Sequence, residues 1–190
     1  MFIVEINNDT QKYVRELLKT KNFGVRPSGF NGSSEQQFHG ICAEVELQKL
    51  FKHELTNGSK GFDNGCDIKH KNLIIDVKTM NRSTDFIQPT WVNNLTKSQT
   101  VYGNNVYIFT SLNKMNMNLT VCGWISKSHM FKVAKLYKKG DIRYKGATKI
   151  EVKVDNYEIE MCDLTQVNSF RQMLDQMNNY SKFISDNNLK

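Results

Sequence analysis

The stretch that most constrains the fold of this chain runs from residue 60 to residue 80, KGFDNGCDIKHKNLIIDVKTM. Its second half alternates as a β-strand with one buried face does, and the apolar side chains that share this face are Leu73, Ile75 and Val77. The other face then carries Asp76 and Lys78, which lie roughly 6.5–7 Å apart along such a strand. The sequence therefore predicts a strand that presents an acid and a base side by side.

A second acid, Asp67, precedes a short polar connection at residues 69–72 and would return to Asp76 if the two segments form a hairpin. Carboxylate oxygens suit Mg²⁺, which often binds one or two acids together with phosphate oxygens. A metal held by Asp67 and Asp76, with the backbone carbonyl of Val77, could lower the pKa of a bound water and orient it for attack on phosphorus. Protonated Lys78 is no metal ligand, but it could stabilise the charged transition state.

A helix is predicted over residues 34–55, because Ser34-Glu35-Gln36-Gln37 has the form of a capping box and apolar residues follow at helical spacing. Glu44 falls on the apolar stripe of this helix, whereas Glu46 projects elsewhere. A carboxylate that points inward needs a partner. Two interpretations stay open: Glu44 pairs with a Lys or Arg, or it borders the same metal site as the two aspartates, through a water molecule.

The composition favours one domain over residues 1–190 and a polyanionic partner. With 39% hydrophobic residues, the chain can build one sizeable core. Its formal charge of +7 and pI near 9.2 favour nucleic acid, and we expect no membrane binding because no predicted helix is strongly basic on one face and strongly apolar on the other. With no signal segment recognised, we expect a soluble, intracellular, cytoplasmic protein, a class that includes virus-encoded proteins acting in a host cell.

The four cysteines are scattered along the chain and form no C-x-x-C pair. Neither a disulfide framework nor a zinc site is therefore indicated, and reduced thiols agree with an intracellular location. His39 and Cys42 form an isolated H-x-x-C that lacks a second pair of ligands and is weak evidence for a metal.

The remaining segments predict a mixed α/β or α+β architecture with one central sheet. From their β-forming residues, further strands are expected at residues 2–6, 90–92, 106–109, 119–125 and 157–161, the last as an edge strand. Further helices are expected near Asn8, after Ser126 or Ser128 as far as Gly140, and after Asp163 or Thr165. Residues 25–34 are predicted to form a surface loop.

Basic residues crowd one short region, residues 138–149. Two interpretations are open for this run: a solvated basic loop, which is the usual meaning, or a segment that contacts a nucleic-acid backbone. The residues that we expect to contact nucleic acid are Lys69, Lys71, Arg82, Lys97, Lys138, Lys139, Arg143 and Lys145.

Together these residues resemble the PD-(D/E)XK nucleases, the restriction-endonuclease-like superfamily. The signature of that family is a helix glutamate, then an acid, then [DE]-x-K on the next strand. The residues that match it in this order are Glu44, Asp67, Asp76 and Lys78. Cys66 stands where the name of the motif has proline, a position at which the superfamily often departs from it.

The resemblance covers about residues 40–109, within a core motif region of about residues 34–125. It implies that Gln99 is the polar residue that many members carry on the helix after the lysine strand. It also implies a mixed central sheet flanked by helices, Mg²⁺ as cofactor with Mn²⁺ as a substitute, DNA as substrate, and a homodimer where both strands of a duplex are cut.

The helix passage GICAEVELQKLF is similar to that of the archaeal Holliday-junction resolvases. The resemblance accordingly implies an endonuclease of repair, recombination, restriction or phage DNA processing. Two alternatives stay open: a catalytically inactive nucleic-acid-binding protein with the same fold, and a nuclease that acts on RNA.

Overall fold

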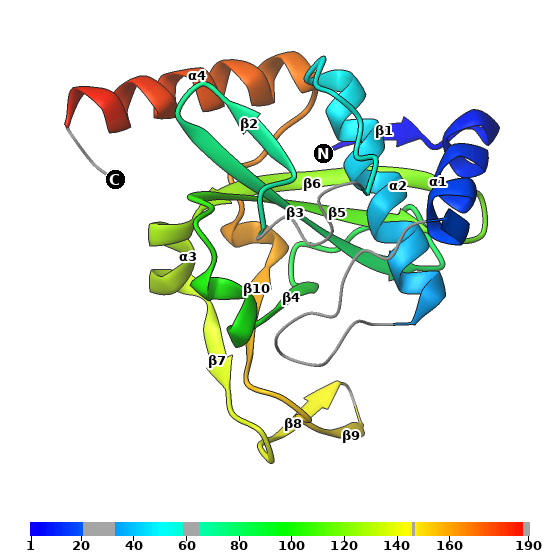
Figure 1. Cartoon of the computed structure of the whole chain (residues 1–190). Helices are drawn as coiled ribbons and strands as arrows, with labels where there is room; N and C mark the ends of the chain where they lie inside the picture. Colours follow the sequence, from blue (N-terminus) through cyan, green and yellow to red (C-terminus); the bar gives the residue numbers. More distant parts are fainter. Residues whose placement is uncertain (21–32, 59–64, 146, 188–190) are drawn as a thin grey trace.

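The computed structural model of the protein describes residues 1–20, 33–58, 65–145 and 147–187 (Figure 1). Almost all of the loop predicted at residues 25–34 lies outside the described residues. Along the chain, the elements are β1 (Phe2–Glu5), α1 (Asn8–Thr20), α2 (Ser34–Leu50), β2 (Ile68–His70), β3 (Leu73–Arg82), β4 (Val92–Thr96), the 3-10 helix η1 (Lys97–Val101), β5 (Val106–Asn113), β6 (Asn118–Ser126), α3 (Lys127–Val133), β7 (Lys135–Tyr137), β8 (Ile142–Lys145), β9 (Thr148–Glu151), β10 (Asn156–Glu160), the 3-10 helix η2 (Met161–Asp163) and α4 (Phe170–Asp186).

The main sheet is mixed and has the strand order β1-β6-β5-β3-β2. β3 and β5 run parallel, with Asp76 opposite Tyr107 and Lys78 opposite Phe109, whereas the other neighbouring strands are antiparallel. A parallel pair needs a crossover connection, and here β4 and η1 lie in that connection. The predicted mixed α/β class with a central sheet is confirmed.

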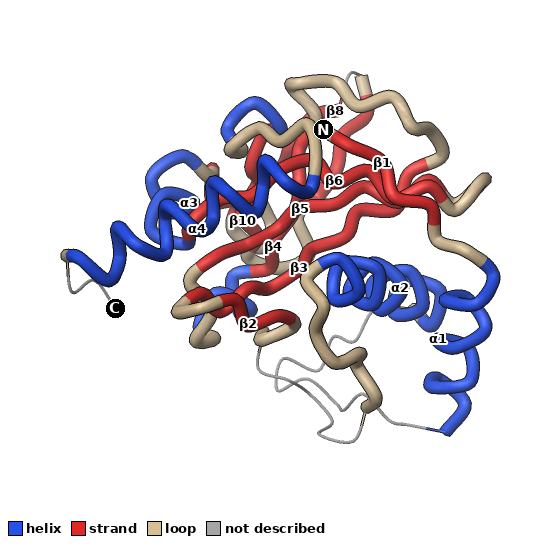
Figure 2. The backbone as a smooth tube through the Cα atoms, turned by 90° about the horizontal axis from the view of Figure 1, so that it is seen from above, coloured by secondary structure: helices blue, strands red, loops and turns tan. Residues whose placement is uncertain are grey.

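Helices cover one face of the main sheet and a second sheet covers the other. Leu47 of α2 and Met173 of α4 share an apolar cluster with Val77 of β3, and Figure 2 shows α4 across the strands and α2 alongside β3. On the opposite face, Tyr107 of β5 packs with Ile159 of β10, which belongs to the antiparallel sheet β4-β10-β7. Because side chains alternate along a strand, the β3 residues on either side of Val77 point toward this second sheet.

The capping residues place α2 slightly differently from the prediction. Ser33, rather than Ser34, is the N-cap, since its hydroxyl accepts the Gln36 backbone N–H and its own N–H donates to the Gln36 side chain. The helix ends at Leu50 instead of near residue 55, because Lys52 adopts a left-handed conformation with φ of 56°.

The last two helices also differ in extent from the prediction. α3 begins after Ser126, one of the two predicted caps, but ends at Val133 rather than Gly140, because residues 135–137 pair with β10 as strand β7. α4 is capped by Ser169, later than either predicted cap. None of the described helices is both long enough and apolar enough to cross a membrane.

Two predictions about the strands near the C-terminus are wrong. β10 is not an edge strand, because β4 pairs with it on one side and β7 on the other. The basic run at residues 138–149 is not a loop, since β8 and β9 pair within it as an antiparallel hairpin. Both corrections depend on strand pairing, which side-chain alternation within one segment does not reveal.

Candidate functional site

A β-hairpin brings Asp67 next to Asp76. β2 and β3 pair with Ile68 opposite Ile75, and Lys71, in a left-handed conformation with φ of 53°, lies in the turn between the strands. Just before β2, the Asp67 backbone N–H donates to the Ile75 carbonyl at 3.0 Å, so the pairing extends to the acid. The hairpin predicted from the sequence is confirmed.

The Asp67 carboxylate folds back onto β3. Its Oδ2 accepts the Val77 backbone N–H at 2.6 Å, while the Asp67 carbonyl accepts Gln48 Nε2 of α2 at 2.9 Å. Thr56 holds the Gln48 amide in turn, through two hydrogen bonds of 2.7 Å. In an extended strand, the N–H and C=O of one residue point to the same side. The Val77 carbonyl therefore points toward the edge where the Asp67 carboxylate lies.

Asp76 and Lys78 share the face of β3 that is turned toward the second sheet, as the alternation predicted. Lys78 Nζ lies 2.7 Å from Asp76 Oδ1, and the two side chains are 17% and 2% exposed. Val77 lies between them with its side chain in the helix-covered core. A carboxylate buried this deeply is costly unless positive charge or hydrogen bonds compensate it, and Lys78 supplies part of that compensation.

The sequence-based prediction did not include Lys127, Tyr102 or Tyr107, which the structure places near Asp76. Lys127, the first residue of α3, donates from Nζ to the Tyr102 carbonyl. Burial lowers the pKa of Lys127, while attraction to the Asp76 carboxylate acts in the opposite direction. Tyr107 lies opposite Asp76 in the parallel pair; burial raises the pKa of its hydroxyl to about 12, and the Asp76 charge adds to this rise. No local pattern marks these residues, because only the tertiary fold brings them to Asp76.

Gly65 closes the other side of the Asp76 carboxylate. A Cβ placed on Gly65 would lie 3.4 Å from Asp76 Oδ2 and 3.1 Å from Tyr102 Cβ. The residue also has φ of +72°, which L-residues adopt at a cost. Glycine therefore allows the backbone just before Asp67 to pass close to Asp76.

Glu44 is half-buried on α2, on the side of the helix that faces the hairpin. Gln48, one turn further along, contacts Asp67 and shares this side of the helix with Glu44. Glu44 thus lies one turn before the residue that contacts Asp67, on α2, which covers the face of β3 opposite to Asp76.

The prediction that Glu46 projects away from the core is wrong. Glu46 is 7% exposed and accepts the Thr10 hydroxyl of α1 as well as Lys49 Nζ, the latter at 3.0 Å. The physical reason is that α1 packs along this side of α2 and buries it. Helical spacing within α2 did not indicate a second helix there.

Gln99 lies half-buried on η1, in the connection from β3 to β5. The resemblance implies a helix at this point, and the structure has a short 3-10 turn. Tyr102, three residues later, provides the carbonyl that accepts Lys127. Gln99 thus belongs to the segment that leads to Tyr102. The contacts of this segment near Asp76 are made by Tyr102 and not by Gln99.

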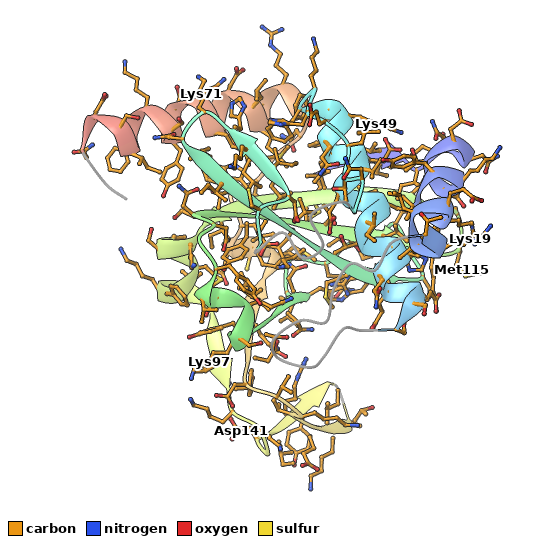
Figure 3. All side chains as sticks on the ribbon, in the orientation of Figure 1. Lys19, Lys49, Lys71, Lys97, Met115 and Asp141 are labelled. Atoms are coloured by element: carbon orange, nitrogen blue, oxygen red, sulfur yellow. The ribbon has the colours of Figure 1, made fainter. Side chains whose placement is uncertain are left out.

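The basic residues predicted to bind nucleic acid do not form one patch. Lys69 and Lys71 are exposed on the β2–β3 hairpin, and Figure 3 shows Lys71 beside α4, at the opposite end of the molecule from Lys97. The Lys145 side chain lies outside what the structure describes.

Two of the predicted nucleic-acid-binding arginines are engaged within the protein. Arg82 donates from Nη2 to the Val92 carbonyl at 3.1 Å and stacks over the Trp91 ring at 4.7 Å. Arg143 forms an ion pair with Glu158, a carboxylate that is 8% exposed. Both guanidinium groups therefore hold elements of the protein together, and their contact with nucleic acid stays a prediction.

Asp155 contacts three of the predicted basic residues at the base of the β8–β9 hairpin. Its Oδ2 lies 3.5 Å from Lys97 Nζ and 3.4 Å from Lys138 Nζ, and its Oδ1 accepts the Lys139 backbone N–H at 3.0 Å. The Lys139 hydrogen bond is the main reason why the pKa of Asp155 is lowered, and both lysine ammonium groups add to it. The side chains of Lys138 and Lys139 are nevertheless exposed.

The donors at the β2–β3 edge suit a hard cation. Asp67 and Asp76 offer carboxylate oxygens and Val77 a carbonyl oxygen, the ligand type that Mg²⁺ prefers. Across the described ranges, no three His, Cys, Asp or Glu side chains gather closely enough to hold a metal by themselves, so water and substrate oxygens would complete the coordination. His39 and Cys42 lie buried within α2, where burial raises the pKa of the Cys42 thiol to about 12.

Comparison with known proteins gives no match: no family model, no curated protein and no solved structure resembles the chain significantly. The case for a function therefore depends on the site itself. This site consists of two acids on one hairpin, a lysine paired with one of them and a second lysine from α3, and main-chain pairing positions the hairpin residues.

Proposed function

We propose that the protein is a Mg²⁺-dependent deoxyribonuclease with a restriction-endonuclease-like fold. The observation that carries the proposal is the β2–β3 edge. There the Asp67 carboxylate contacts the Val77 backbone, and Asp76 and Lys78 stand side by side on the same strand. The order along the chain, two acids and then a lysine, is the one that the resemblance implies.

Each residue has a distinct role in this proposal. Asp67, Asp76 and the Val77 carbonyl would hold Mg²⁺, which when bound supplies an activated water and neutralises charge on the phosphate. Lys78 would lose its pairing to Asp76 when the metal takes up that carboxylate, and its ammonium would then stabilise negative charge on the phosphate. Glu44, one turn before Gln48 on α2, would orient a water molecule.

The arrangement of elements supports the proposed fold. A helix with its glutamate precedes the hairpin, the lysine strand β3 lies inside a mixed sheet, and helices cover one face of that sheet while a second sheet covers the other. The crossover from β3 to β5 departs from the expectation, because a strand and a 3-10 turn take the place of a helix. The homodimer stays a proposal, and sedimentation of the purified protein at micromolar concentration tests it.

The test is a cleavage assay on supercoiled, linear, single-stranded and branched DNA, with and without Mg²⁺, with labelled RNA in parallel. We expect wild-type protein to cut DNA only with Mg²⁺ or Mn²⁺. Asp67→Asn should abolish cleavage but keep a side-chain oxygen to accept the Val77 N–H, so its stability should change little. Lys78→Ala should also lose cleavage. Cleavage at the wild-type rate by both variants would place the site elsewhere.

One observation favours a second candidate, a nucleic-acid-binding protein of the same fold that lacks activity. The Lys78–Asp76 ion pair is nearly buried, as a purely structural pair would be. This candidate predicts DNA binding without Mg²⁺-dependent cleavage in wild-type protein, and binding that Asp67→Asn leaves unchanged. Cutting of RNA but not DNA in the parallel assay would instead identify a ribonuclease.

A further inference from the structure

The β8–β9 hairpin extends beyond the second sheet, at the end of the molecule farthest from α4 (Figure 1). In its register, Ile142 stands opposite Glu151 and Tyr144 stands opposite Lys149. Directly opposite residues of an antiparallel pair project from the same face. These four residues therefore form one face of the hairpin, here called the outer face, and all four are exposed, with Tyr144 70% exposed.

The inner face and the base of the hairpin are fixed to the protein. Arg143, on the inner face, forms its ion pair with Glu158 of β10. At the base, the Gly140 N–H donates to the Val152 carbonyl at 2.8 Å, and the Val152 N–H donates to the Asp141 carbonyl at 2.9 Å. An isolated two-stranded hairpin is marginally stable in water. These contacts thus hold the outer face in a defined position while leaving it uncovered.

Positive charge is concentrated on this part of the chain. Residues 135–153 contain seven Lys or Arg and two Asp or Glu, a net charge of +5, out of +7 for the whole protein. The exposed lysines of this segment are Lys135, Lys138, Lys139, Lys149 and Lys153. An exposed tyrosine among lysines suits a polyanion that also presents flat apolar groups, as nucleic-acid bases do.

The hairpin lies on the same side of the main sheet as Asp76 and Lys78. Both residues point toward the second sheet, from which the hairpin extends. Lys97, at the start of η1, donates its backbone N–H to the Asp155 carbonyl at 2.9 Å and so connects the hairpin base to the segment that leads to Tyr102. A polyanion held by the hairpin would therefore run past the side of the main sheet toward which Asp76 and Lys78 point.

We propose that the β8–β9 hairpin inserts into the major groove of duplex DNA, with Tyr144 and Ile142 toward the base edges and the flanking lysines on the phosphates. A major groove about 12 Å wide admits a two-stranded ribbon. The deep, narrow major groove of A-form RNA does not, which favours duplex DNA over duplex RNA. This inference rests on the proposed function and deepens it, by assigning duplex DNA as the substrate class and this hairpin as the element that holds it.

The test is fluorescence anisotropy with a labelled DNA duplex of about 20 base pairs in EDTA, over a series of salt concentrations. We expect the double variant Lys149→Glu, Lys153→Glu to weaken binding about tenfold or more and to reduce the salt slope by about 1.8, the value for two lost phosphate contacts. Tyr144→Ser keeps the charge and should weaken binding to DNA but not to an RNA duplex of the same sequence. The matched control is Lys19→Glu on α1, which Figure 3 shows away from the hairpin.

Wild-type affinity and salt slope in the double variant, or equal losses for Lys19→Glu, would overturn the inference. If circular dichroism shows that the double variant is unfolded, the result for Tyr144→Ser is used instead. Unchanged DNA binding by Tyr144→Ser, or an equal loss of affinity for the RNA duplex, would then contradict insertion of the hairpin into the DNA major groove. A failure of the proposed function has a different outcome: wild-type protein would bind duplex DNA but would not cut it when Mg²⁺ is added.

Discussion

At the scale of single residues, the electrostatics around Asp76 are the central feature. This carboxylate is almost wholly buried beside Lys78, its charge attracts the Lys127 ammonium group, and it helps to raise the pKa of the Tyr107 hydroxyl. The two lysines therefore compensate part of the cost of burying the Asp76 carboxylate inside the protein.

Lys127 provides a test of this environment at the scale of one residue. Lys127→Ala removes a cation near Asp76 and the donor to the Tyr102 carbonyl. If the site is catalytic, we expect the Mg²⁺-dependent cleavage rate to fall on the order of 100-fold, as for the loss of one charge-stabilising donor. Lys132→Ala, exposed on the same helix, is the control. Equal rates for the two variants would remove Lys127 from the site.

His39 gives a prediction about pH. Burial is the main reason why the pKa of His39 is lowered from 6.5, while Glu35 and the hydrogen bond to Asn81 act in the opposite direction. The unfolded chain then binds a proton near pH 6.5 that the folded protein does not, so His39 favours the folded state above this pH, and the contribution is lost as the pH falls. Urea unfolding should show a larger stability loss between about pH 7.5 and about pH 5.5 for wild-type protein than for His39→Gln.

The control for this pH effect is His129→Gln, at an exposed position on α3. It should keep the wild-type difference in unfolding free energy between the two pH values. If His39→Gln and His129→Gln show the same pH dependence as wild-type protein, His39 is not the group responsible.

At the scale of elements, close main-chain contacts position the site. β3 is held between β2 and β5, and the Gln48 side chain of α2 fixes the backbone at Asp67. On the other side of the sheet, the chain that leads to α4 crosses β6, where Trp124 and Thr165 form a β-bridge. This backbone pairing fixes the chain before α4 against β6, the strand that leads directly into Lys127.

Gly123 tests this close backbone contact. A Cβ at position 123 would lie 2.6 Å from the Thr165 carbonyl oxygen, so Gly123→Ala must displace backbone. We expect the free energy of unfolding to fall by about 1–3 kcal/mol, the usual cost of overpacking. Gly103→Ala is the matched control, because a Cβ there would meet nothing within 4 Å. Urea denaturation of both variants measures the difference, and equal stabilities would contradict the close contact.

At the scale of the whole molecule, positive charge and acidic chemistry are separated. The acids stand on the hairpin of the main sheet, whereas most of the net charge belongs to the segment around β8 and β9. In the proposed function, a separate binding element would hold the polyanion without placing many cations next to the acids that would bind the metal. Affinity and cleavage should therefore respond to different substitutions.

The salt dependence of DNA binding tests the charge distribution as a whole. With cleavage blocked by EDTA, we expect the logarithm of the binding constant to fall linearly with the logarithm of salt concentration, by about 0.9 for each phosphate contacted. Anisotropy titrations at several salt concentrations measure this slope. Binding that is insensitive to salt would contradict a nucleic-acid partner and favour a structural role.

Much of the site follows from local patterns. Alternation along residues 73–78 suffices to place Val77 in the core and Asp76 beside Lys78, and the polar turn at residue 71 predicts the hairpin that returns Asp67. Both inferences hold because a strand has a fixed two-residue period and a short turn leaves little choice of register.

The tertiary structure decided the contacts between distant segments, which the side-chain periodicity of a single segment cannot indicate. It buried Glu46 against α1, placed Lys127 near Asp76 and paired the basic run at residues 142–151 into a hairpin. The sequence alone determined the strand, its faces and the charge of the chain, since these depend on neighbours in sequence. Which helix, lysine or strand meets each face depends on packing between distant segments, because burial is shared among all the elements of the core.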